Sequence, residues 1–148
     1  MGVDEARDAL THSPFFAGCA AADLAKLAAY ADVHTYEAGR WLFHEGAQHE
    51  WFGVIVRGDM ALVHDRRRRP LRVGIAGAGV ALGEGALLDA PPHPAGGYAR
   101  TRVTVLRVSM VAVRELGGAY PALVAQIAAR AGVRSATDGN QAAVSERR

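Results

Sequence analysis

The sequence has 148 residues, half of them hydrophobic, which suffices for one domain with a complete core. Its formal net charge of +2 is too small to indicate nucleic-acid binding, and its one cysteine, Cys19, excludes an internal disulfide. No apolar segment approaches the ~20 residues of a membrane-spanning helix, and the N-terminus lacks the apolar core of a signal peptide. We therefore expect a cytoplasmic protein that does not enter a membrane.

Motifs of metal and catalytic sites are missing from the sequence. The six histidines do not have the spacing of zinc ligands. There is also no serine elbow, no catalytic cysteine–histidine signature and no phosphate-binding loop of the nucleoside-triphosphatase type. We expect no metal, no cofactor and no enzymatic activity.

One helix followed by many short strands is predicted for most of the chain. Leu24 and Leu27 lie at helical spacing, which predicts a helix over residues 21–31. From residue 33 to residue 108, short β-like segments alternate with glycine turns. This pattern predicts a mainly β protein, an antiparallel β-roll or jelly-roll barrel, with only one short helix near residues 84–89.

Two details of the strand region bear on the candidate sites. Arg66, Arg67, Arg68 and Arg69, followed by Pro70, indicate the tip of a hairpin. Residues 99–108 are predicted to form a single strand, which places Arg100 and Arg102 on one of its faces.

Helices return at the C-terminal end. Ser109 is a suitable N-cap for the segment that follows it, and Pro121 fits the first turn of a second helix. In that second helix, Leu123, Ile127 and Ala131 share one face. Residues 135–148 are polar and without periodicity, so we expect a disordered tail after a domain over residues 1–134.

Several motifs, in order over residues 9–134, resemble the cyclic-nucleotide-binding domain of the catabolite activator protein type. They are Phe15–Cys19, Tyr36–Gly39, Leu42–Gly46, Phe52–Gly58 and Leu82–Leu88. The resemblance implies a cupin-like β-roll with an N-terminal helix and C-terminal hinge helices. It also implies a regulatory module whose ligand is cyclic AMP or cyclic GMP.

The resemblance assigns a phosphate-binding cassette to the segment that begins at Gly83. It implies that the backbone amides of Gly83, Glu84, Gly85 and Ala86 hold the cyclic phosphate and that the Glu84 carboxylate accepts from the ribose. Glycine lets a ligand approach the backbone closely, and the free N–H groups of a helix start attract an anion.

The end of the cassette departs from the family pattern. His93 stands where the family has the arginine that clamps the phosphate, and Gly96 stands where it has a small hydroxyl residue; Ala95 completes the expected ligand set. An imidazole is a poor substitute for a bidentate guanidinium. Arg100 and Arg102 are possible substitute phosphate contacts, with solvated strand arginines as the alternative.

Two functions remain open from the sequence. The first is a sensor domain with an altered cassette; the second is a ligand-free module that binds a protein partner or another copy of itself. In the second case, Arg66, Arg67, Arg68 and Arg69 are candidates for partner binding. No segment supplies the helices of a helix-turn-helix module, so we expect no direct sequence-specific DNA binding.

Overall fold

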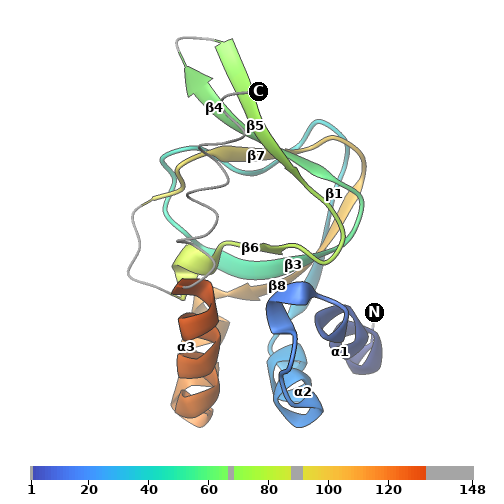
Figure 1. Cartoon of the computed structure of the whole chain (residues 1–148), viewed down its shortest axis with the longest axis vertical. Coiled ribbons are helices and arrows are strands. Elements are labelled where there is room, and N and C mark those ends of the chain that lie inside the picture. Colours follow the sequence, from blue (N-terminus) through green and yellow to red (C-terminus); the bar gives the residue numbers. More distant parts are fainter. Residues whose placement is uncertain (1, 67–68, 88–91, 133–148) are drawn as a thin grey trace.

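The computed structural model describes residues 2–66, 69–87 and 92–132. Its strands form two four-stranded antiparallel sheets, in the orders β1-β8-β3-β6 and β2-β7-β4-β5, which face each other as a roll (Figure 1). The strands are β1 Asp32–Tyr36, β2 Trp41–Phe43, β3 Trp51–Arg57, β4 Met60–Arg66, β5 Arg69–Ala76, β6 Ala81–Leu82, β7 Gly96–Ala99 and β8 Val103–Ser109. The predicted antiparallel β-roll is confirmed.

Helices lie outside the roll, against the sheet that contains β8 (Figure 1). They are α1 Val3–Thr11, the 3-10 turn η1 Pro14–Phe16, α2 Ala21–Ala29, α3 Met110–Ala119 and a further helical stretch over residues 121–132. The helix predicted over residues 21–31 is confirmed as α2. The only helical element between the first and last strand in the described residues is the 3-10 turn η2 Glu84–Ala86, near its predicted place.

Alternation along β8 builds two separate cores. Val103 and Val105 are fully buried and face the inside of the roll, where they join Ile55 of β3. Leu106 and Val108 point the opposite way and pack in the cluster formed by the helices. Because successive side chains of a strand alternate, one strand supplies both cores.

The segment 99–108 is not one strand, so this prediction was wrong. β7 ends at Ala99, a turn follows, and β8 begins at Val103. The amides of Arg100 and Thr101 donate to the carbonyl oxygen of Asp59, at 3.0 and 3.5 Å, and these bonds turn the chain. The turn packs closely on the neighbouring one, since a Cβ on Gly58 (φ 84°) would meet the Arg102 carbonyl oxygen.

The sequence analysis also missed α1. Ala6 and Leu10 of this helix are buried and one turn apart, and the rest of the helix is mostly polar. Two apolar residues in a polar segment do not by themselves predict a packed helix, and only the structure shows that α2 lies beside them.

The predicted hairpin is confirmed in its backbone. β4 and β5 pair over their whole length, with Arg66 opposite Arg69. The tip residues 67–68, and the tail over residues 135–148 that was expected to be disordered, lie outside the described residues.

The C-terminal helices agree with the sequence analysis. Ser109 Oγ accepts a hydrogen bond from the Ala112 amide at 3.1 Å, so Ser109 is the N-cap of α3. In the stretch 121–132, Leu123, Ile127 and Ala131 are all buried, as their shared face predicted. Within the described part of the chain, no helix has both the length and the apolar character needed to span a bilayer.

Replacement of Ser109 by alanine is expected to lower the free energy of unfolding by about 1 kcal/mol, because the Ala112 amide loses its acceptor. Urea denaturation of Ser109→Ala and wild type measures the difference. Ser109→Asp keeps a side-chain acceptor and is the control. Equal stability of Ser109→Ala and wild type would contradict the role of this cap.

Candidate functional site

The cassette begins with a tight turn between β6 and η2. Gly83 has a left-handed conformation (φ 71°, ψ 29°), and a Cβ at this position would meet the Trp51 carbonyl oxygen. Only glycine fits both conditions. The turn is closed by the Ala86 amide, which donates to Gly83 at 2.9 Å, so this amide is engaged within the turn itself.

Glu84 opens η2, where the resemblance placed the acceptor for a ribose. Its residue is half-buried, and its Oε1 atom is buried. A carboxylate accepts hydroxyl hydrogen bonds well, so the geometry is compatible with the expected role.

His93 lies on the other side of the site and is almost completely buried, with 8% of its surface exposed. Its backbone is fixed by two hydrogen bonds of 2.9 Å, from His93 N to Ala47 O and from Gly46 N to His93 O. Its ring stacks on Phe43, with centroids 4.2 Å apart and planes 12° apart. The side chain is therefore held against the loop that follows β2.

This environment removes the charge of His93. Burial and, to a smaller extent, the neighbouring His49 together lower the pKa of His93 from 6.5 to about 4. At neutral pH the position that the family fills with a guanidinium thus holds a neutral ring.

His49 is a site residue that the sequence analysis missed. Its ring centroid lies 4.0 Å from that of His93. It also covers η2, since its Cε1 and Cδ2 atoms lie 2.5 and 2.6 Å from the position of a Cβ on Gly85. The two imidazoles thus fill the space between η2 and the residues that end the cassette.

Ala95 and Gly96 lie next to this pair, at the start of β7. Both are buried. A Cβ on Gly96 would approach Trp41 Cζ3 to 2.9 Å and the Glu45 amide nitrogen to 3.3 Å. The place of the expected hydroxyl side chain is therefore occupied by Trp41.

Arg100 and Arg102 do not belong to this site. They lie in the turn between β7 and β8, where Arg100 pairs with Asp59 at 3.7 Å and Arg102 pairs with Glu37 at 3.3 Å. This turn packs at the Gly58 end of β3, whereas Gly83 packs at the Trp51 end. The length of this seven-residue strand, about 20 Å, separates them from η2.

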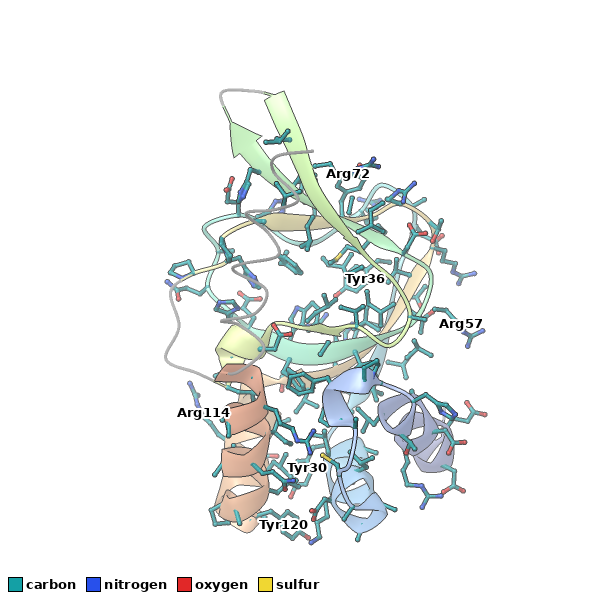
Figure 2. All side chains as sticks on the ribbon, in the orientation of Figure 1. Tyr30, Tyr36, Arg57, Arg72, Arg114 and Tyr120 are labelled. Atoms are coloured by element: carbon teal, nitrogen blue, oxygen red, sulfur yellow. The ribbon has the colours of Figure 1, made fainter. Side chains whose placement is uncertain are left out.

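Aromatic contacts continue from His93 into the roll. The Phe43 ring lies 6.4 Å from the Trp51 ring, and the Arg107 guanidinium lies 4.9 Å from the centroid of Trp51. Arg107 Nη1 donates to the Tyr36 hydroxyl at 2.7 Å. Figure 2 shows Tyr36 between the two sheets and Arg57 at the outer edge of the roll.

Tyr36 and Phe43 belong to the motifs that carry the resemblance, but none of these interior residues was predicted to line a site. One signal was available for Arg107, because it continues the alternation of Val103 and Val105 towards the inside of the roll. No comparable signal exists for His49. Among the described residues, no group of three or more histidine, cysteine or acidic side chains is arranged to hold a metal ion.

The family model of the cyclic nucleotide-binding domain matches residues 33–120. The chain belongs to this family. Domains of the family are regulatory modules, as the resemblance implied. A search of the curated proteins found no match.

Solved structures show the same fold. A cyclic nucleotide-binding domain from Methylobacillus flagellatus is 18% identical, with a TM-score of 0.78, and the match covers 95% of this chain and 79% of that chain. The N-terminal domain of a transcriptional regulator from Streptomyces coelicolor is 28% identical, with a TM-score of 0.74 and coverage of 90% and 95%. The regulatory subunit of a cAMP-independent protein kinase A from Trypanosoma cruzi, bound to guanosine, is 21% identical, with a TM-score of 0.71 and coverage of 86% and 45%.

Within this cyclic nucleotide-binding domain, the low pKa of His93 makes stability depend on pH. The folded state keeps His93 neutral down to about pH 4, whereas the unfolded chain takes up a proton near pH 6.5. Protons then favour the unfolded state, so stability is lost as the pH falls through this window. Between about pH 7.5 and about pH 5 we expect a loss of about 2 kcal/mol from this residue.

Denaturant titrations at the two pH values measure this loss in wild type and in His93→Phe, which keeps a ring on Phe43 but cannot be protonated. The loss is expected to be smaller in His93→Phe by the amount that His93 contributes. His12→Gln, which changes an exposed histidine, is the control and keeps the full loss. The same pH dependence in His93→Phe and wild type would show that His93 is not the residue responsible.

Proposed function

We propose that this chain is a regulatory sensor domain whose altered cassette selects a ligand by its ribose and base rather than by a cyclic phosphate. The preferred ligand is an uncharged purine nucleoside. The observation that carries this proposal is the buried, neutral His93 in the place of the family's arginine.

A phosphate that loses its desolvated charged partner typically loses about 2–5 kcal/mol of binding free energy, or about 30-fold to several thousand-fold in affinity. Arg100 and Arg102 do not compensate, because both lie at the far end of β3 and are paired with carboxylates. An uncharged ligand has no such loss.

The sugar side of the site supports the same ligand class. Glu84 is retained, and its partly buried carboxylate is placed at the start of η2, the position of the family's ribose acceptor. The Trypanosoma cruzi relative offers a precedent within the fold, since it is cAMP-independent and its structure contains guanosine.

Calorimetry with guanosine, adenosine, cyclic GMP and cyclic AMP tests the proposal. We expect each nucleoside to bind at least as tightly as its cyclic nucleotide. Glu84→Gln is expected to weaken binding by about tenfold, because a charge-assisted hydrogen bond to the ribose is lost. Glu50→Gln, which changes an exposed glutamate, is the matched control.

The pH dependence adds a second criterion. Because His93 stays neutral down to about pH 4, affinity for the cyclic nucleotides should not rise as the pH falls from about 8 to about 6. A cyclic nucleotide that binds tenfold more tightly than its nucleoside would overturn the proposal. So would a rise in its affinity through the usual titration range of histidine.

A ligand-free interaction module is the second candidate function. The observation that favours it is the His49 ring, which covers η2 at Gly85 and meets His93 at 4.0 Å. In this case the fold would serve to present its surface to a protein partner or to another copy of the chain. Absence of binding for all four compounds at millimolar concentration would select this function over the sensor.

A further inference from the structure

Arg107 occupies an unusual place for a cation. On β8 it shares the inward face with Val103 and Val105, which are fully buried in the core of the roll. Its partners in the sheet are Asp32 of β1 and Gly53 of β3. Since Gly53 has no side chain, the neighbouring strand leaves room above it for the Trp51 ring, with Cζ3 at 2.9 Å from the position of a Cβ.

The guanidinium is held in one orientation. One face lies over Trp51, 4.9 Å from the ring centroid, in a cation–π contact. Its Nη1 atom donates to the Tyr36 hydroxyl at 2.7 Å. A planar group fixed by both its face and one of its nitrogens is pre-organised, so little side-chain entropy is left to lose on binding.

The opposite edge of the guanidinium carries a donor that makes no hydrogen bond among the described residues. Arg107 Nε is buried, and it has no hydrogen-bond acceptor among the residues that the structure describes. A buried donor without an acceptor destabilises the folded state, because its desolvation is not compensated. The Nε–H and the adjacent Nη2–H point the same way, which is the fork that binds two oxygens of a carboxylate or phosphate.

The charges around Arg107 leave the position electropositive. Asp32 is its register partner, but no ion pair joins the two in the described residues. Burial lowers the pKa of the nearby His34; Arg107 lowers it as well, by more than Asp32 raises it. The positive charge of Arg107 therefore dominates at His34.

We propose that Arg107, positioned by Trp51 and Tyr36, binds an oxyanion through its Nε edge on the inward face of the first sheet. The ligand group is a phosphate or a carboxylate. Arg107 is not one of the cassette residues: its guanidinium packs on Trp51, Trp51 packs on Phe43, and Phe43 stacks on His93. It is also independent of the nucleoside proposed for Glu84.

Trp51 provides the readout. The chain has two tryptophans, so a Trp41→Phe background leaves Trp51, which stacks on Arg107, as the only indole. Inorganic phosphate is titrated against sodium chloride of equal ionic strength. We expect a saturable change of Trp51 fluorescence with phosphate in the millimolar range.

Variants locate the site. Arg107→Gln should abolish the fluorescence change. Arg107→Lys keeps the charge but loses the two-nitrogen fork, so it should weaken phosphate binding by about tenfold or more. Arg57→Gln removes an exposed arginine at the outer edge of the roll and should bind as wild type (Figure 2). Thermal unfolding without phosphate verifies that each variant is folded.

Adenosine 5′-monophosphate and acetate distinguish the source of the anion. Equal responses to phosphate and the nucleotide assign recognition to the oxyanion alone, and a much stronger response to the nucleotide assigns it to a nucleotide's phosphate. Glu84→Gln should leave the phosphate response unchanged, whatever it does to nucleosides. The proposal is overturned if phosphate gives no saturable change, if Arg107→Gln responds as wild type, or if Glu84→Gln abolishes the response.

Discussion

Side chains of β8 point alternately into two hydrophobic cores, and both halves of the protein depend on this one strand. Val105 belongs to the core of the roll, and Leu106, the next residue, belongs to the core under the helices. A shift of β8 by one residue would exchange these faces, so its register with β1 and β3 is strongly specified. Ser109 then ends the strand and caps α3. The end of the sheet thus fixes the start of the helix.

The candidate site holds a stack of rings at the position that the family fills with an arginine. A buried guanidinium needs an anion, because it stays charged at any accessible pH. An imidazole in the same place escapes this requirement by losing its proton, and burial gives His93 that state. Its neutral ring then stacks on Phe43 and contacts His49.

The cassette position of the family's arginine holds a histidine, but an arginine lies elsewhere in the roll. Arg107 lies on the inner face of the same roll, fixed by Trp51 and Tyr36. The rings between the two positions form a continuous contact from His49 to Arg107.

The sequence by itself determined the family fold and the places where several turns and helices begin. Glycine turns between β-like segments predicted the roll, and Ser109 and Pro121 marked the starts of the last helices, because caps and turns depend on residues a few positions apart. It did not determine the break at Arg100, which depends on bonds to the carbonyl oxygen of Asp59 about forty residues away. The motif order placed His93 in the cassette, but only the tertiary structure decided that this histidine is neutral and that the Nε atom of Arg107 is a buried donor. Charge state and hydrogen-bond satisfaction are set by neighbours from distant strands, and a linear sequence does not say which neighbours those are.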